Sequence, residues 1–192
     1  EIHAKTVIIS TGASAKWLGL ESEIRLRDIG GGVSACAVCD GFFYRGQDVV
    51  IVGAGDSACE EASYLAKLCN KVTMLVRRDK MRASKAMQHR VKGLENIEIL
   101  YNTKTVEVIG EEAVEAVKVK NNTTGEESTL QATGFFVAIG HTPNTAIFKD
   151  YIELDEQGYI VQNQPGTSIT NVEGVFWSGD CADKIYKQAV TA

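Results

Sequence analysis

The sequence predicts an α/β fold in which a doubly wound parallel sheet carries a β-meander. An apolar strand over residues 49–52 runs directly into a glycine-rich turn and a helical pattern, which is the start of a βαβ unit. A second strand follows over residues 71–76. Alternating, strand-like segments over residues 97–132 then precede another fully apolar strand at 134–140. A meander inserted before the last parallel strand accounts for this order.

Size and composition indicate an ordinary globular protein. The chain has 192 residues, of which 44% are hydrophobic and 23% charged, so it can form one domain or one domain with pieces of another. The formal net charge of -5 gives no reason to expect a nucleic acid or an anionic membrane as partner. No apolar run reaches the roughly 18–20 residues of a membrane span.

The cysteine count favours a reducing, cytoplasmic compartment. An odd number of cysteines scattered through an α/β pattern is not typical of a secreted disulfide framework. The chain opens at Glu1 without Met and closes at Ala192 in the middle of a pattern, so we expect a piece of a longer protein. The five cysteines are Cys36, Cys39, Cys59, Cys69 and Cys181.

The first expected element is a buried strand over residues 5–13 that ends in the small-residue turn Thr11-Gly12. It is either the edge of a sheet or the place where a chain leaves a flavin-binding domain, and the residues alone do not decide between the two. The pattern over residues 17–34 is irregular. Three glycines at 30–32 predict a flexible approach to the first cysteine pair.

The pair Cys36-x-x-Cys39, followed at once by Asp40, is the centre of the functional prediction. Two thiols three positions apart can close a small disulfide and open it again. A zinc module is the alternative, but structural zinc usually takes four ligands in two spaced pairs. The remaining candidates Cys59, Cys69 and His89 lack a second short spacing. We therefore predict a redox pair and no metal site.

The glycine-rich turn after the strand 49–52 predicts a dinucleotide site. In the pattern Gly53-x-Gly55-x-x-Ala58, the first glycine allows a tight turn and the second lets a pyrophosphate approach the backbone. The third small residue lets the helix expected over 57–68 pack on the strand. The helix N-terminus then offers N–H groups and a positive dipole end to the phosphates.

The end of the strand 71–76 favours NADP over NAD. A chain built for NAD usually places an acid there for the ribose hydroxyls, whereas this chain has Arg77, Arg78 and Arg82. Guanidinium groups suit a 2′-phosphate by charge and geometry. A solvated basic turn is the alternative. A helix is expected next, over residues 84–94.

The remaining elements complete the meander and a change of character near residue 145. Strands are expected at 97–101 and 105–109, followed by a hairpin and by the apolar strand 134–140. Two short strands around Gly158, a strand ending at Gly179-Asp180 and a helix from Tyr186 onward close the chain. The hairpin strands are expected at 113–120 and 127–132, flanking a polar turn.

Taken together, these motifs resemble bacterial-type, low-molecular-weight thioredoxin reductases. The matching stretches come in that family's order and extend over nearly the whole chain. The resemblance implies a Rossmann-like fold of the FAD/NAD(P)-binding domain superfamily with three-layer ββα architecture. The matching stretches are residues 35–44, 53–62, 77–79 with 82–83, 136–145, and Gly179-Asp180 with Gln188-Ala189.

The resemblance also implies a domain division and an activity. Residues 1–19 and 146–192 would be FAD-domain segments, and residues 20–145 the NADP-binding domain. Electrons would pass from NADPH through FAD to a Cys36–Cys39 disulfide and on to thioredoxin. Cys39 would lie nearest the flavin, Cys36 would attack thioredoxin, and Asp40 would be the acid/base. The full-length protein would be a homodimer, with hinges near Gly19 and residues 145–146.

By the same resemblance, two sets of residues would bind cofactors. The NADP set would comprise Gly53, Ala54, Gly55, Asp56, Ser57 and Ala58 at the pyrophosphate and Arg77, Arg78 and Arg82 at the 2′-phosphate. The FAD set would comprise Thr11, Gly12, Gly179, Asp180, Lys187, Gln188 and Ala189.

Three departures and two rival readings remain. Val76 stands where the family often has His, Lys187 where Arg is common, and Cys181 where an aliphatic residue is common. We interpret Cys181 as a small buried residue. The flavoprotein subunit of an alkyl hydroperoxide reductase is one rival, although such proteins typically use NADH and lack the paired arginines. A non-catalytic NADP-binding fragment is the other.

Overall fold

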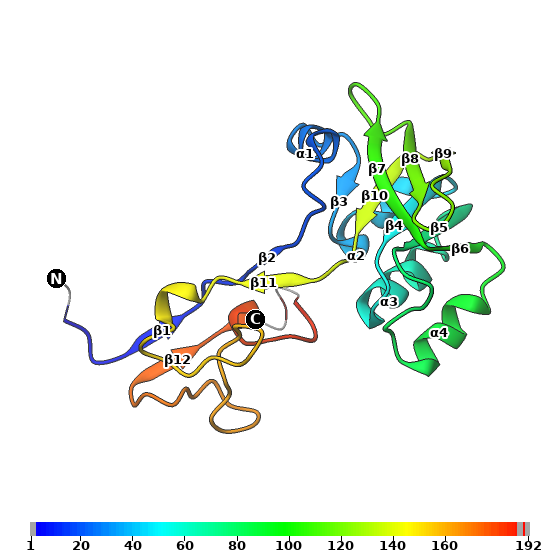
Figure 1. Ribbon diagram of the computed structural model, residues 1–192. Helices are drawn as coiled ribbons and strands as arrows, with labels where there is room; N and C mark the ends of the chain where they lie inside the picture. Colours follow the sequence, from blue (N-terminus) through cyan, green and yellow to red (C-terminus); the bar gives the residue numbers. More distant parts are fainter. Residues whose placement is uncertain (1–2, 188–189, 191–192) are drawn as a thin grey trace. The chain divides into compact units, whose positions relative to one another are not determined.

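The computed structural model describes residues 3–187 and residue 190 (Figure 1). The chain divides into two compact units. Unit 1 comprises residues 1–15 and 141–192, and unit 2 comprises residues 16–140. The division lies within five residues of the boundaries expected from the sequence. That these units are an FAD and an NADP domain stays a prediction.

Unit 2 is built on a five-stranded sheet in which every pairing is parallel. The strands expected at 49–52, 71–76 and 134–140 all lie in it, so the predicted α/β class is confirmed. The last of them ends at Val137, three residues earlier than expected. The order across the sheet is β3 (Val33–Ser34), β10 (Gly134–Val137), β4 (Asp48–Val52), β5 (Lys71–Val76), β6 (Ile97–Tyr101).

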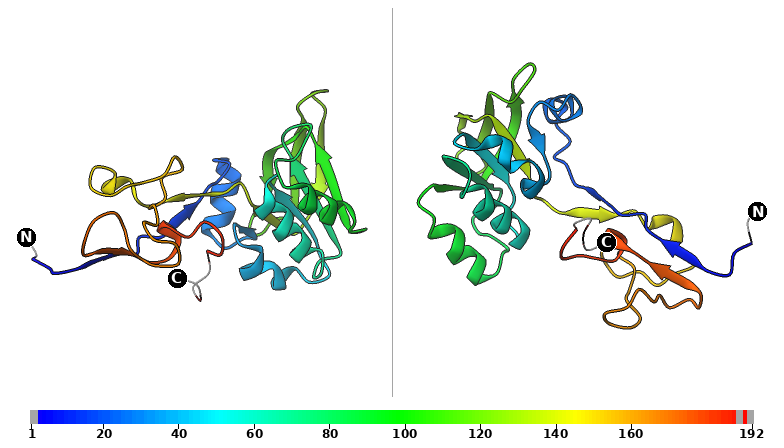
Figure 2. Two further views of the ribbon diagram at one scale, coloured as in Figure 1. Left: turned by 90° about the horizontal axis from the view of Figure 1, so that it is seen from below. Right: turned by 180° about the vertical axis from the view of Figure 1, so that it is seen from behind.

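Alternate side chains of this sheet enter two different cores, because successive residues of a strand point to opposite faces. Val49 and Ile51 pack with the helices α3 (Asp56–Leu65) and α4 (Lys85–Lys92), whereas Val50 packs with the meander. Figures 1 and 2 show these helices and the meander on opposite faces. The predicted three-layer arrangement is therefore confirmed.

The meander is a separate three-stranded antiparallel sheet. The hairpin and the preceding strand predicted from the alternating pattern are present, with boundaries shifted by up to three residues. The meander packs against the parallel sheet through Val108, Val117 and Val119, each at most 2% exposed. Its strands are β7 (Thr103–Ile109), β8 (Ala116–Asn121) and β9 (Glu127–Gln131).

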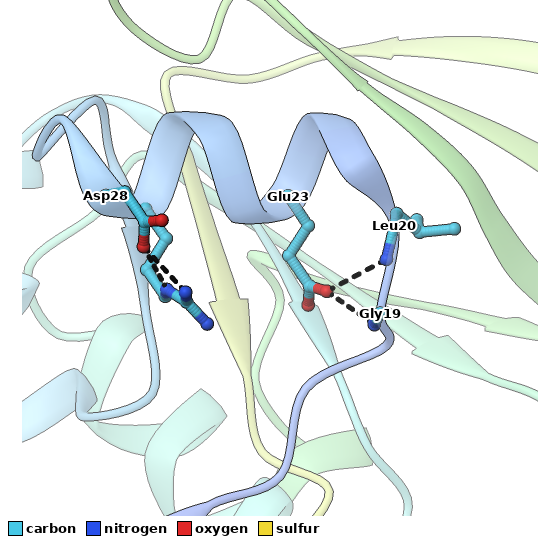
Figure 3. Close-up of polar contacts among 5 residues, drawn as sticks. Gly19, Leu20, Glu23 and Asp28 are labelled. Atoms are coloured by element: carbon cyan, nitrogen blue, oxygen red, sulfur yellow. Dashed lines mark hydrogen bonds and ion pairs between the residues drawn. The ribbon is translucent and has the colours of Figure 1, made fainter.

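A helix that the sequence did not reveal, α1 (Glu21–Asp28), lies in the segment expected to be irregular. The fully buried Glu23 carboxylate accepts hydrogen bonds from the backbone N–H groups of Leu18, Gly19 and Leu20, and so satisfies donors at the start of the helix. Figure 3 shows the bonds from Gly19 and Leu20. Leu26 is buried beside it in the meander core. The expectation of an irregular segment is therefore wrong over Glu21–Asp28.

Two of the three glycines before the cysteine pair, Gly31 and Gly32, are closely packed, whereas Gly30 has open space beside it. A Cβ atom on Gly31 would lie 2.6 Å from the carbonyl oxygen of Glu112, and Gly32 has a φ of +98°. Two short helices follow, α2 (Ala37–Asp40) and the 3-10 helix η1 (Gly41–Tyr44). Backbone atoms crowd Gly31, and the positive φ of Gly32 is one that glycine adopts readily. We therefore correct the predicted flexibility of these two glycines.

Unit 1 pairs segments that are distant in sequence. Strand β1 (Val7–Ile9) lies parallel to β12 (Val175–Trp177), and β2 (Ala13–Ala15) lies antiparallel to β11 (His141–Pro143). Short 3-10 helices complete the described part of the unit. They are η2 (Ala146–Phe148) and η3 (Gly179–Cys181).

Three expectations for unit 1 need correction. The first strand is not buried along its length, because β12 is its one described partner; Val7 is 49% and Ile8 67% exposed. The two strands expected around Gly158 reduce to a single bridge between Leu154 and Ile160. Tyr186 and Lys187 are not helical, and the next two residues of the expected helix lie outside the described residues. No helix within the described ranges is both long and apolar enough to span a bilayer.

Candidate functional site

Three groups singled out from the sequence follow three strands of the parallel sheet at the same edge. The cysteine pair follows β3, the glycine-rich turn follows β4, and the arginines follow β5. Since the strands are parallel, their carboxyl ends share one edge, where α/β proteins bind ligands. Adjacent strands lie about 4.8 Å apart, so the strands leading to the thiols and to the glycine turn are about 10 Å apart across β10.

Cys36 and Cys39 form a disulfide, with their Cα atoms 5.3 Å apart. Cys36 is half-buried and Cys39 is exposed. The Cys36 Sγ also accepts the backbone N–H of Cys39 at 3.2 Å, which fixes the first sulfur at the start of α2. The two sulfurs are bonded to each other, so neither is a thiolate available to a metal. No group of three or more His, Cys, Asp or Glu within the described ranges is placed to hold one.

Ser34 connects Asp40 to the cysteine pair. Its hydroxyl donates to Asp40 Oδ2 at 2.6 Å and accepts the backbone N–H of Cys36 at 3.0 Å. Ser34 is 8% exposed at the end of β3. The acid predicted after the second cysteine is therefore oriented toward the first by a residue that the sequence analysis did not single out.

Tyr44 packs against strand β10 near Asp40. Its ring meets that of Phe136 edge-on, with centroids 5.3 Å apart, and a Cβ on Gly134 would lie 2.7 Å from it. Burial raises the pKa of the Tyr44 hydroxyl, and the charge of Asp40 raises it further. Tyr44 is therefore a neutral hydrogen-bonding group near the acid at physiological pH.

Glu61, on helix α3, reaches the first residue of helix α2, Ala37, which lies between the two cysteines. Its Oε2 accepts the backbone N–H of Ala37 at 3.3 Å. Burial raises the pKa of this carboxyl to about 7; the bond from Ala37 opposes that shift and the charge of Glu60 adds to it. Glu61 thus changes charge near neutral pH while bonded to Ala37, between the two cysteines of the disulfide. No sequence motif indicated this residue.

The raised pKa of Glu61 predicts a pH-dependent stability. The native state binds a proton at Glu61 that the unfolded chain has already lost, so the free energy of unfolding falls as pH rises from the unfolded pKa near 4.5 to the native value near 7. Allowing for partial exposure, we expect a loss of about 2 kcal/mol.

Urea unfolding of the wild type and of Glu61→Gln from pH 4.5 to 8 measures this effect, because the other titrating groups cancel in the difference. The stability difference between the two proteins should change by that amount over this interval. A constant difference would show that Glu61 titrates normally.

The glycine-rich turn combines close packing at its first glycine with open space at its second, as a dinucleotide-binding turn requires. A Cβ on Gly53 would lie 2.4 Å from the carbonyl oxygen of Ala138 and 2.5 Å from the Cβ of Ala58, so this glycine permits close packing of turn, helix and strand. A Cβ on Gly55 would meet nothing within 4 Å. Gly55 is the N-cap of the ten-residue helix α3. The turn therefore leaves open space beside a helix N-terminus, which fits a pyrophosphate.

Arg77, Arg78 and Arg82 are exposed on a loop whose main chain is held at both ends. At its start, the carbonyl oxygen of Arg77 accepts the Asn122 side-chain amide at 2.9 Å. At its end, the Arg82 N–H donates to the carbonyl oxygen of Ala54 in the glycine turn at 2.8 Å. The two predicted phosphate-binding groups are thus joined by backbone hydrogen bonds.

The residues predicted to bind FAD that the structure describes lie in unit 1. The carboxyl ends of the parallel strands β1 and β12 bring Thr11-Gly12 beside Gly179-Asp180. Ser178 N–H donates to the carbonyl oxygen of Ile9 at 2.9 Å, and the Cys181 thiol donates to the same oxygen. Thr11, Gly12, Gly179 and Asp180 thus lie at one end of this strand pair, as a shared cofactor site would require. Lys187 N–H donates instead to Asp183, while Gln188 and Ala189 lie outside the described residues.

The remaining cysteines are structural. Cys59 and Cys181 are 0% exposed and Cys69 is 6% exposed, and none of them forms a disulfide. Burial raises the pKa of all three thiols, that of Cys69 to about 11. A thiol is a poor nucleophile when protonated. The interpretation of Cys181 as a small buried residue is confirmed.

Comparisons with known proteins place the chain in a family. The family model described as pyridine nucleotide-disulphide oxidoreductase matches residues 1–192. The chain is 51% identical to a thioredoxin reductase of Dictyostelium discoideum over 193 residues and 49% identical to one of Rickettsia prowazekii over 195 residues. These matches cover the whole chain but 60% and 62% of those relatives, so the chain spans about three fifths of their length.

Solved structures agree with this assignment. A thioredoxin reductase from Giardia duodenalis matches with a TM-score of 0.89 at 46% identity, over 97% of this chain and 60% of that one. A thioredoxin reductase from Streptococcus pyogenes matches with a TM-score of 0.87 at 37% identity, over the same shares of the two chains. With a disulfide and a glycine-rich turn at one sheet edge and a family match along its whole length, this chain belongs to the pyridine nucleotide-disulphide oxidoreductase family.

Proposed function

We propose that the full-length protein containing this chain is an NADPH-dependent thioredoxin-disulfide reductase. The observation that carries the proposal is the Cys36–Cys39 disulfide at the same sheet edge as the glycine turn and the arginine loop. The relatives named thioredoxin reductase, which are about 50% identical to this chain, support it. NADPH would lie on the turn at Gly53–Ala58 with its 2′-phosphate toward Arg77, Arg78 and Arg82.

FAD, when bound, would relay two electrons from NADPH to the disulfide. Opening the sulfur–sulfur bond then yields two thiols and consumes two electrons and two protons. Cys39 is proposed as the sulfur facing the flavin and Cys36 as the nucleophile that forms a mixed disulfide with thioredoxin. Asp40 would hold and return the proton as the thiolate forms and is lost, and its bond from Ser34 keeps the carboxylate next to the Cys36 backbone.

The surface around the disulfide suits a protein substrate. Val38, Phe42 and Phe43 are 54%, 61% and 73% exposed on α2 and η1, the first between the two cysteines and the others just after the second. Exposed aromatic side chains next to a reactive group are typical of protein-binding surfaces. We propose that thioredoxin contacts this surface while its disulfide meets Cys36.

Other assignments are part of the same proposal. The three buried free thiols suit a reducing compartment, so a cytoplasmic location is proposed. Homodimer formation and rotation of one unit about hinges near Gly19 and residues 145–146 are proposed from the family resemblance. The flavoprotein subunit of an alkyl hydroperoxide reductase remains the second candidate, and the arginine loop favours the first. A non-catalytic NADP-binding fragment would describe the chain if it acted alone.

The visible absorbance spectrum of the full-length protein tests the proposal. Addition of NADPH under anaerobic conditions should bleach a flavin band, and oxidised thioredoxin should restore it. A protein that binds NADPH without a flavin signal would be a nucleotide-binding module. A protein that is reduced faster by NADH and fails to reduce thioredoxin would support the alkyl hydroperoxide reductase alternative.

Two glycine substitutions separate folding from nucleotide binding. Gly55→Ala adds a methyl group in open space at a φ of -95°, so the thermal midpoint should barely change, while the pyrophosphate loses its close approach. A steric cost of about 1–3 kcal/mol corresponds to an affinity for NADPH that is about 5- to 150-fold weaker.

Gly53→Ala is the matched variant. Its methyl group would overlap Ala138 and Ala58, so we expect about 2 kcal/mol or more of lost stability. Calorimetric titration and thermal melting of both variants make the comparison. Unchanged NADPH affinity in Gly55→Ala would show that the phosphates lie elsewhere.

A further inference from the structure

We propose that Asn122, in the turn after β8, is a positioning residue that sets the preference for a 2′-phosphorylated nucleotide. It would act by holding the main chain of Arg77 and Arg78 in place. The inference rests on the proposed function, because it assumes that these arginines face the 2′-phosphate. It goes further by assigning part of the cofactor selectivity to the meander, an element with no other role in the mechanism.

Two asparagines hold the start of the arginine loop. The Asn122 side-chain amide donates to the carbonyl oxygen of Arg77 at 2.9 Å, and the Asn122 backbone N–H donates to the carbonyl oxygen of Asn102 at 2.6 Å. Asn102 in turn donates its backbone N–H to the carbonyl oxygen of Arg78 at 3.0 Å. Asn102 has a φ of +53°, a left-handed conformation that asparagine tolerates better than most residues.

The far end of the same loop is fixed to the glycine turn. The backbone N–H groups of Arg82 and Ala83 both donate to the carbonyl oxygen of Ala54, at 2.8 and 2.9 Å. The N–H of Ser84 donates to Asp56 Oδ1 at 2.8 Å. Between the two ends, Met81 is 6% exposed and lies 4.0 Å from the Cys59 sulfur. The main chain is therefore held at both ends and anchored by Met81, while the arginine side chains stay exposed.

This arrangement separates selectivity from overall nucleotide binding. The start of the loop carries Arg77 and Arg78, whose bonds to a 2′-phosphate depend on a preorganised backbone. The glycine turn, which would bind the pyrophosphate common to NADPH and NADH, is held from the opposite end. Asn122 is uncharged, so removing its amide leaves the electrostatic field of the loop unchanged. Its loss should weaken binding of the phosphorylated nucleotide alone.

Steady-state kinetics of the full-length protein with Asn122→Ala test the inference. One hydrogen bond to a positioned group is worth about 1–1.5 kcal/mol, so KM for NADPH should rise about 5- to 10-fold. The kcat with NADPH and the KM for NADH should stay within about twofold. Asn122→Leu, which keeps the approximate size but has no donor, should behave in the same way.

Thr124→Ala is the control on the same turn. The Thr124 hydroxyl accepts the backbone N–H of Glu126 and makes no bond to the arginine loop in the described structure. This variant should retain wild-type selectivity. Equal losses for NADPH and NADH in Asn122→Ala, or equal changes in Thr124→Ala, would overturn the inference in favour of a general effect of the hairpin.

The arginine pair distinguishes failure of this inference from failure of the proposed function. If Arg77→Gln/Arg78→Gln abolishes the NADPH preference and both Asn122 variants keep it, the inference alone is wrong. If the preference survives loss of the arginines, the 2′-phosphate lies elsewhere, and both the assigned cofactor site and the inference fall.

Discussion

Replacing Cys39 by serine in the full-length protein is expected to lower NADPH-dependent reduction of thioredoxin by at least about 10³-fold. Cys39 shares a disulfide with Cys36, and an oxygen in place of either sulfur prevents that bond from forming. Without that disulfide, the two electrons from NADPH cannot be held as a dithiol on this chain and passed on to thioredoxin. Cys36→Ser should give a loss of the same size, because the two sulfurs act as one unit.

The control is Cys69→Ala. Cys69 is 6% exposed and makes no disulfide, so this change should alter stability but leave turnover within about twofold. NADPH binding, followed by fluorescence or calorimetry, should survive in all three variants. Thioredoxin turnover that persists in Cys36→Ser or Cys39→Ser would disprove the proposed electron path.

Loss of both Arg77 and Arg78 is expected to reverse the cofactor preference. Each hydrogen bond to a charged phosphate is worth about 1.5–3 kcal/mol, so Arg77→Gln/Arg78→Gln should raise KM for NADPH about 100-fold or more. KM for NADH should change by less than about threefold, because NADH has no group at this position. Both arginines are exposed, so the fold should tolerate the change.

Arg90→Gln provides a control for surface charge, since Arg90 is exposed in the last turn of α4 and the change removes one positive charge, half of what the double variant loses. Its KM for NADPH should stay near the wild-type value at physiological salt. If KM values for NADPH and NADH rise equally in the double variant, the arginines act through the general charge of the surface. The NADP assignment would then be wrong.

Much of unit 2 could be predicted because its strands lie in the interior of one sheet. Val49–Val52 is apolar without interruption and Val72–Val76 is interrupted only by Thr73, which is the pattern of a strand covered on both faces. Helix α1 gave no such signal. Its start depends on the buried carboxylate of Glu23, and an acidic residue in a polar segment does not reveal from the sequence that it will be buried.

The candidate site divides in the same way. Cys36, Cys39 and the glycine turn could be found because their chemistry requires a fixed local spacing. Ser34 was missed although its partners Cys36 and Asp40 lie two and six positions away, because no motif marks a serine before the pair. Glu61 and Asn122 could not be found, because their partners are set by the tertiary fold: Asn122 meets Arg77 across 45 positions of the chain. Long-range contacts of this kind carry no local pattern, so a single sequence does not reveal them.

Burial of the three unpaired cysteines has a practical consequence for chemical labelling. Because Cys59, Cys69 and Cys181 are at most 6% exposed, a bulky maleimide added to the folded chain has access to two sulfurs, and to those only after a reductant has separated them. The mass of the labelled protein therefore reports the oxidation state of that couple directly. Site-specific probes can be attached there without first engineering a cysteine-depleted background.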